Sequence, residues 1–198
     1  MPISNYPNGF AEGVSIRGVP LLSAYPGEVF WVDSVNGSNG NKGTFDRPFA
    51  TIDYAIGRCT ANRGDIIMVK AGHTETISGA AGIACDVAGV AIVGLGTGSN
   101  RPTLNFTATA STVTVTAANV TLRNLLLTGG IDAVVTMLAI SGADCSLLDI
   151  ETRDVTGQMV SAITTADGAA RLLIDNYIHR GAAAAGGANA IELVGADD

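Results

Sequence analysis

The sequence has few aromatic residues, and this shortage restricts the kind of core it can build. Phe, Trp and Tyr together make up 5% of the 198 residues, whereas glycine alone accounts for 25 positions. Large aromatic side chains therefore cannot fill the interior, and small and β-branched residues must pack there in tight layers. This composition favours an all-β fold, and the length favours one domain with a substantial core.

Cysteine and positive charge are also scarce. The three cysteines, Cys59, Cys85 and Cys145, form no CxxC pair, which argues against a disulfide framework and against a thiolate zinc site. Eleven Lys and Arg residues stand against eighteen Asp and Glu residues, for a net charge of −7, and no basic cluster is present. We therefore expect buried thiols and no nucleic-acid partner.

Long apolar runs are missing as well. The sequence contains no run of 18 apolar residues that could cross a membrane. Its first residues, MPISNYPNGFAEG, lack the basic start and the apolar region of a signal peptide. We expect no membrane partner, and synthesis and folding in a reducing cytoplasm.

Residues 1–27 differ from the rest of the chain in being punctuated by proline and glycine without a helical or strand period. They are nevertheless too apolar for a solvated linker. We predict an extended arm over 1–27 that lies on a partner, and a second unit over 28–198. The candidate contact residues of the arm are Ile3, Tyr6, Phe10, Ile16, Leu21, Leu22 and Tyr25.

An internal repeat follows the arm. Four segments resemble one another, AGVAIVGL, ANVTLRNL, ADCSLLDI and AARLLIDN, and they begin at Ala88, Ala118, Ala143 and Ala169. Their alignment makes Ile92, Leu122, Leu147 and Leu173 equivalent, with spacings of 30, 25 and 26 residues. Each unit has room for two or more short strands and shows no helical pattern, so a βαβ arrangement is excluded.

These repeats predict a right-handed parallel β-helix, in which coils stack and like residues form inward columns. The inward residues are expected to be Val120, Leu122, Cys145, Leu147 and Leu173, whereas Thr121, Arg123 and Ser146 should face outward. The segment RPFATIDYAIGRC predicts a short capping helix near 50–59, begun by Thr51 as N-cap and with Gly57 near its end. The last coil, IELVGADD, looks unfinished, and we expect a partner subunit or further residues to cover it.

A resemblance to known proteins covers residues 30–78. The segments WVDSVNGSNGNKGTFDRPFATIDYAI and GDIIMVKAGHTETI resemble the entry of right-handed β-helix proteins of the pectate-lyase-like superfamily, which often begin with a strand, an NGxxGxxG loop, a cap helix and a GD strand. The opening SNYPNGFAEGVSIRGVPLL is similar to virion proteins of tailed bacteriophages that carry such a β-helix. This second resemblance implies a capsid decoration (cement) protein, or another virion component, commonly a trimer.

Enzymes of that superfamily cleave polysaccharides, so a catalytic site must be considered. Asp149 and Asp175 align in one column with Asn124, and one coil apart their separation would be about 5 Å, which suits paired carboxylates. The favoured interpretation of this column is a ladder of hydrogen-bonded turn residues. Catalysis by the two aspartates is the alternative. Beyond this column, the charged residues Glu151, Arg153 and Asp154 are expected at a solvated edge.

Other motifs that resemble ligand sites are interpreted as turns and loops of the fold. The stretch DSVNGSNGNKGTFDRPFAT could offer oxygens to calcium but lacks the EF-hand spacing, and GLGTGS lacks the GxGxxG order and the helix of a phosphate loop. The two histidines, His73 and His179, lack a paired ligand motif, and His179 is expected at the surface after a strand. Trp31 is expected to pack against the cap. We predict no catalytic residue, no metal and no cofactor.

Two functions are compatible with these features. In the first, the chain is a structural virion protein on the capsid surface, made in the host cytoplasm, that binds the major capsid protein through its arm and forms a homotrimer. In the second, it binds or cleaves polysaccharide as a tailspike or lyase does. The scarcity of aromatic platforms in the repeats favours the first.

Overall fold

A computed structural model describes residues 15–16, 19–20, 26–154, 159–181 and 187–195. Of the predicted arm contacts, Ile16 lies in strand β1 (Ser15–Ile16), which pairs antiparallel with β2 (Val19–Pro20). The other six, Ile3, Tyr6, Phe10, Leu21, Leu22 and Tyr25, lie outside the described residues, so their role stays a prediction.

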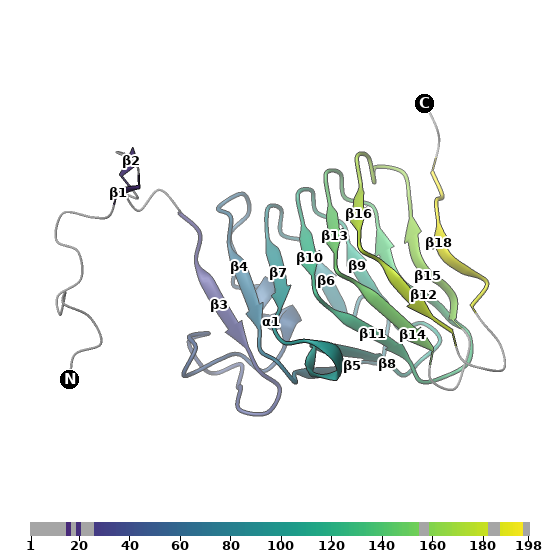
Figure 1. The fold of residues 1–198 in the computed structure, drawn as a ribbon, viewed down its shortest axis with the longest axis horizontal. Helices are drawn as coiled ribbons and strands as arrows, with labels where there is room; N and C mark the ends of the chain where they lie inside the picture. The colour runs from purple at the N-terminus through teal and green to yellow at the C-terminus, as the bar shows by residue number, and fades with distance from the viewer. Residues whose placement is uncertain (1–14, 17–18, 21–25, 155–158, 182–186, 196–198) are drawn as a thin grey trace.

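The chain winds into a parallel β-helix in which each full coil contributes one strand to each of three parallel sheets. The first sheet contains β3 (Val29–Val32), β4 (Ile66–Val69), β7 (Ala91–Gly94), β10 (Thr121–Arg123), β13 (Ser146–Leu148) and β16 (Leu173–Asp175). The second contains β5 (Thr74–Ile77), β8 (Thr103–Phe106), β11 (Leu126–Gly129), β14 (Glu151–Asp154) and β17 (Ile178–Arg180). The third contains β6 (Ile83–Cys85), β9 (Val113–Val115), β12 (Val134–Ile140), β15 (Met159–Thr165) and β18 (Asn189–Glu192). Figure 1 shows the coils stacked side by side from β3 to β18.

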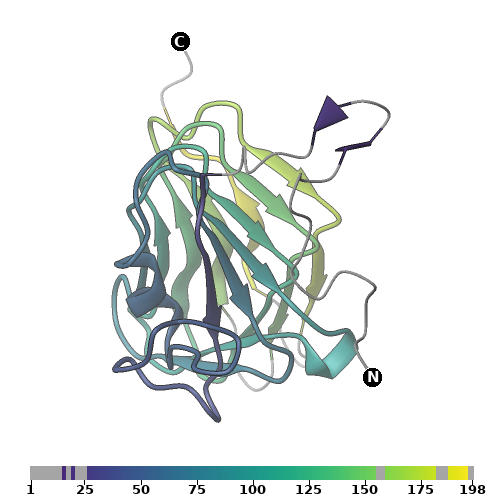
Figure 2. The ribbon, with the colours of Figure 1, turned by 90° about the vertical axis from the view of Figure 1, so that its left-hand side faces the viewer.

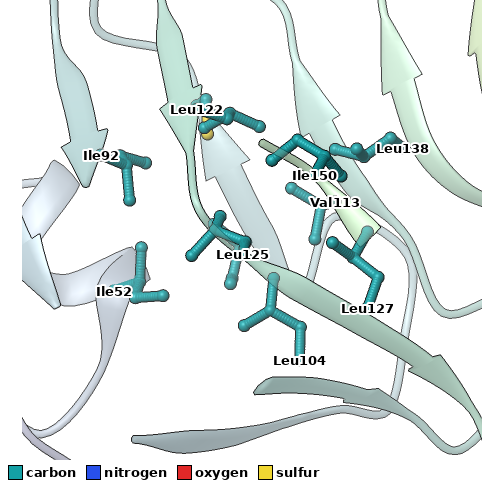
Figure 3. Close-up of a pocket in the computed structure, with 11 residues that line it drawn as sticks. Ile52, Ile92, Leu104, Val113, Leu122, Leu125, Leu127, Leu138 and Ile150 are labelled. Carbon is teal, nitrogen blue, oxygen red and sulfur yellow. The ribbon is translucent and has the colours of Figure 1, made fainter. Parts of the chain in front are cut away.

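Columns of aliphatic side chains form the core. Ile67, Ile92, Leu122 and Leu147 occupy successive positions in the first sheet, and all four are buried. Burying each of them stabilises the fold by about 1.5–3 kcal/mol relative to leaving it in water. A void of about 10 Å³ between such columns, shown in Figure 3, is lined only by apolar side chains and is a packing defect.

The predicted register is right for three repeats and wrong for the fourth. Ile174, and not Leu173, pairs with Leu147, while Leu173 pairs with Ser146 and is 53% exposed. The reason is length, because residues 166–172 connect β15 to β16 whereas only residues 141–145 connect β12 to β13. A slip of one residue reverses the inward and outward faces of a strand.

The predicted capping helix is confirmed. Helix α1 (Ile52–Ile56) begins after Thr51, whose side chain accepts a hydrogen bond from the Tyr54 amide at 3.4 Å, and ends at Gly57. The helix buries Ile52, Ala55 and Ile56 against the first coil. Figure 2, which looks at the β3 end, shows α1 on one side of the stack. No helix among the described residues is long and apolar enough to cross a membrane.

The polar loop over 33–51 covers the edge of β3. The Trp31 amide donates to the Gly43 carbonyl at 2.7 Å, and the Phe49 amide donates to the Trp31 carbonyl at 2.8 Å. A side chain at Gly37 would meet the Asp33 carbonyl oxygen at 2.1 Å, so only glycine fits this close approach. The loop therefore satisfies a strand edge that would otherwise be open to pairing with another chain.

Candidate functional site

Polar side chains gather in a groove on the outside of the stack. The groove has a volume of about 270 Å³ and lies where the 3-10 turn η1 (Gly98–Asn100), between β7 and β8, approaches the β14 and β17 coils. In Figure 2, η1 lies on a different side of the stack from α1. The lining residues are Thr97, Gly98, Arg101, Asn124, Asp149, Ile150, Glu151, Asn176 and Ile178.

A ladder of turn residues forms one wall of this groove. Asn124, Asp149 and Asn176 all have positive φ, at 55°, 56° and 53°, a conformation that Asn and Asp tolerate better than most other residues. The Asn176 amide donates to an Asp149 carboxylate oxygen at 2.8 Å, and the Asn124 amide donates to the Gly94 carbonyl at 2.9 Å. The favoured interpretation of this column as hydrogen-bonded turn residues therefore holds for Asn124 and Asp149, but the side-chain bond between adjacent coils joins Asp149 to Asn176.

Asp175, however, does not belong to this column. It lies in β16 and pairs with Leu148, which in turn pairs with Arg123, while Asn176 takes the place next to Asp149. The predicted alignment of Asp149 with Asp175 is wrong because the last repeat is one residue longer than the sequence alignment assumed. The two aspartates are therefore not equivalent carboxylates on adjacent coils.

Asp149 is held in its charged form. Its pKa is lowered first by the hydrogen bond from Asn176 and then by Arg123, whose Nε lies 3.2 Å from the carboxylate. A carboxyl group with a lowered pKa carries no proton near neutral pH, so it cannot serve as a general acid there.

Glu151 is buried beneath guanidinium groups, which corrects the prediction that it lies with Arg153 and Asp154 at a solvated edge. It is 4% exposed, and its Oε1 atom accepts hydrogen bonds from Arg153 Nη2 at 2.6 Å and from Arg180 Nε at 2.9 Å. Arg101 donates to the other carboxylate oxygen. Burial alone would raise the pKa of Glu151, but Arg153 and Arg101 outweigh it, and the net pKa lies below the usual range.

Asp154 differs from these residues because it faces the interior. It pairs with Gly129, which lacks a side chain and leaves room for the carboxyl group, and it is 5% exposed. Burial raises the pKa of Asp154, an effect that the backbone amide of Met159 and the charge of His179 offset only in part. Its place inside the stack separates this acid from the groove.

Both histidines have polar partners within the fold. His73 is buried, and its Nε2 lies 3.1 Å from Glu75, which also accepts the Ile52 amide at the start of α1. His179 lies within β17 and not after a strand, and its Nδ1 lies 3.0 Å from the Thr152 hydroxyl. Among the described residues, no three His, Cys, Asp or Glu side chains come together as a metal site would require.

Several oxygen-bearing side chains of the 33–51 loop bind the loop itself. Asp33 accepts hydrogen bonds from the amides of Val35 and Asn36, and Asn39 accepts from the Ala50 amide at 2.9 Å. The Asp46 carboxylate accepts from Thr44 at 2.7 Å. These contacts support the architectural interpretation of the stretch over the calcium interpretation.

The ring partner of Trp31 lies in the 33–51 loop, whereas Trp31 was expected to pack against the cap. The Trp31 ring meets the ring of Phe45 edge-on, with 4.8 Å between the ring centres. Phe45 is 62% exposed, and Lys70 Nζ lies 4.4 Å from the centre of its ring. Phe49 packs against the cap instead, with its ring 5.0 Å from that of Tyr54.

The opposite end of the stack has an open hollow. It is lined by segments 165–170 and 193–195 together with Leu172, Ile174 and Ile191. Leu193 is 78% exposed and Val194 is about half exposed. Among the described residues this end carries no helix comparable to α1.

No family model matches this chain, and no curated protein matches it. Among solved structures, a rhamnogalacturonan lyase is similar to it at 16% identity with a TM-score of 0.49, over 78% of this chain and 51% of the lyase. A GH136 lacto-N-biosidase from Eubacterium ramulus is similar at 16% identity with a TM-score of 0.49, over 77% of this chain and 34% of the enzyme. The chain thus spans about half of the first protein and a third of the second.

Proposed function

We propose that this chain is a structural virion protein of the capsid-decoration type, which binds the major capsid protein lattice and stabilises the head. The observation that carries the proposal is the state of the carboxylates in the groove. Asp149 and Glu151 are each paired with arginine, and the pKa of each is lowered. The groove therefore lacks a proton donor of the kind that glycosidic bond cleavage requires.

The chemistry of glycoside hydrolysis explains why this matters. One carboxyl group must keep its proton at working pH so that it can protonate the leaving oxygen, which calls for a raised pKa. Asp154 has a raised pKa but is buried inside the coil stack. Arginine is a poor base because its guanidinium stays protonated in proteins. Asp149 and Glu151 are ionised, but their lowered pKa values make them weaker bases than free carboxylates. Lyase chemistry, which needs a base, is therefore also poorly served.

Binding in this proposal comes from the arm and from repetition. The apolar residues of 1–27, with Tyr6, Phe10, Leu21 and Leu22 among them, would order on the capsid surface, and the β-helix would project from it. In a homotrimer three arms act together, so weak single contacts suffice for stable attachment. The resemblance of the opening segment to bacteriophage virion proteins supports this assignment.

Removal of the arm tests the mechanism. Full-length protein and a variant that begins at Glu28 are mixed with expanded capsids assembled from the major capsid protein of the same genome, and bound protein is measured by co-sedimentation. We expect saturable binding of the full-length chain and at least a tenfold loss for the variant. Circular dichroism confirms that the variant is folded. Unchanged stoichiometry and affinity of the folded variant would contradict arm-mediated binding.

Polysaccharide binding or cleavage is the second candidate, and the groove itself favours it. Arg101 and the Asn124 and Asn176 amides line an open channel that could receive an acidic sugar. Incubation with a panel of acidic polysaccharides, followed by ultraviolet absorbance and reducing-end assays, separates the two functions. Turnover that Asp149→Ala abolishes would replace the structural proposal by the enzymatic one.

A further inference from the structure

We propose that the arginine cluster around Glu151 binds an oxyanion, a sulfate or a carboxylate carried by a ligand. The cluster consists of Arg101, Arg153 and Arg180, and among the described residues Glu151 is the only carboxylate that pairs with them. Three guanidinium groups therefore form ion pairs with a single carboxylate. This local excess of positive charge lies on a chain whose net charge is −7.

The strand register places like charges next to each other, and a bound anion would reduce their repulsion. Arg153 and Arg180 occupy directly adjacent positions in β14 and β17. Neighbouring strands lie about 4.8 Å apart, and like charges directly opposite each other destabilise a sheet. Both arginines donate to the same oxygen of Glu151. One carboxylate oxygen thus serves two stacked cations, and a second anion would complete their neutralisation.

Hydrogen-bond donors remain for such an anion. Arg180 uses Nε on Glu151, Arg153 uses Nε and Nη2, and Arg101 uses Nη2 together with an Nε bond to the Gly98 carbonyl. Each guanidinium has five N–H donors in a planar fork, so the bonds to Glu151 use only part of them. The side chain of Arg180 is 62% exposed and can reach a ligand in solution.

The groove provides space beside Arg101 and Glu151, while Arg153 and Arg180 reach Glu151 from outside its lining. Its volume of about 270 Å³ is larger than a single tetrahedral oxyanion needs, and Arg101 and Glu151 both line it. Asp149, which also lines the groove, is paired with Arg123.

Anion titration tests the site. Sodium sulfate is titrated into the full-length chain at constant ionic strength, with sodium chloride as the balancing salt, and binding is followed by amide chemical shifts and by isothermal titration calorimetry. We expect saturable shifts at residues 97–101 and 178–180. Arg180→Gln should weaken sulfate binding about tenfold, as loss of one partly exposed charge-assisted hydrogen bond would. Arg171→Gln, which removes an exposed arginine paired with Asp144, is the matched control and should leave the affinity unchanged.

Two further ligands identify the carrier of the oxyanion. If the affinity for tetragalacturonate exceeds the affinity for a tetraglutamate peptide, the site is assigned to sugar acids. If the order of affinities is reversed, it is assigned to an acidic protein segment. An absence of saturable shifts at constant ionic strength, or equal sulfate affinity for the parent and the Arg180→Gln protein, would overturn the proposal. Neither result depends on the capsid assay.

Discussion

Glu151 illustrates how strongly one buried carboxylate can determine a charged surface. Its neighbours along β14 suggest an exposed edge, yet the chain segment that ends at Arg101 covers it and brings a third guanidinium to it. Only the alternation of Glu151 and Arg153 at two-residue spacing, which places both on one face of a strand, could have indicated this contact from the sequence.

Removal of the Glu151 charge is expected to destabilise the fold. Glu151→Gln leaves Arg153 and Arg180 stacked without a counter-charge, and the free energy of unfolding should fall by about 2 kcal/mol. This is less than for a fully buried pair because both arginines are partly exposed. Urea denaturation at pH 7 measures the change. Glu28→Gln, at an exposed ion pair with Arg63, is the control and should cost under about 0.5 kcal/mol.

The pH dependence of the Glu151 effect follows from its lowered pKa. A carboxylate with a lowered folded-state pKa contributes stability that is present above its unfolded pKa and is lost as the pH falls through the folded value. The difference between the parent and Glu151→Gln should therefore shrink below about pH 4. A difference that stayed constant down to pH 2 would assign the effect to packing.

Asp154 should show the opposite sign. Because burial raises its folded-state pKa, its charged form costs stability at neutral pH, and that cost disappears as the pH falls below the unfolded value. Asp154→Asn is expected to raise the free energy of unfolding at pH 7, with a gain that fades towards pH 4. Denaturation curves at pH 7, 5 and 4 measure this trend. Destabilisation at pH 7 would show that the ionised carboxylate is needed.

At the scale of the element, helix α1 depends on a short network at its first turn. Thr51 accepts the Tyr54 amide, Asn39 donates to the Thr51 hydroxyl at 3.2 Å, and Glu75 accepts the Ile52 amide at 3.0 Å. Thr51→Ala should therefore lower the free energy of unfolding by about 1 kcal/mol. Thr51→Ser, which keeps the hydroxyl, should recover most of the loss. Equal losses for both variants would mean that the Thr51 methyl group, and not the cap, matters.

The elements also differ in how far the sequence predicts them. The capping helix and the strands of the first and third sheets follow from apolar periodicity, because their inward residues are aliphatic. The strands of the second sheet are harder to recognise, since β5 reads TETI and β14 reads ETRD. Their polar residues lie inward or under a covering segment, and this burial depends on contacts between coils that are distant in the sequence. The groove could not be predicted from the sequence for the same reason.

The slip at β16 has a similar cause. The sequence ARLLIDN offers three successive apolar positions, Leu172, Leu173 and Ile174, and any of them could face inward by periodicity alone. The length of the preceding turn decides among them, and the pairing of Ile174 with Leu147 sets the register. Asp175 then moves out of the Asp149 column, and with it the pairing on which the catalytic alternative was based.

At the scale of the whole molecule, the coil stack has two unlike ends. One end is closed by α1 and the 33–51 loop, and the other end carries β16 and β18 (Figure 1). Leu193 and Val194, which follow β18, are exposed to solvent there. Apolar side chains exposed together favour contact with another surface. In the proposed virion role such contacts would lie between subunits or against the capsid.

The most direct test of the proposed function is electron cryomicroscopy of heads produced with and without this chain. The decoration role predicts density on the outer capsid surface, at regular lattice positions, into which the three-sheeted coil stack fits with the 1–27 segment towards the major capsid protein. This density should vanish from heads made without the chain. Identical capsid surfaces in both samples would contradict the account.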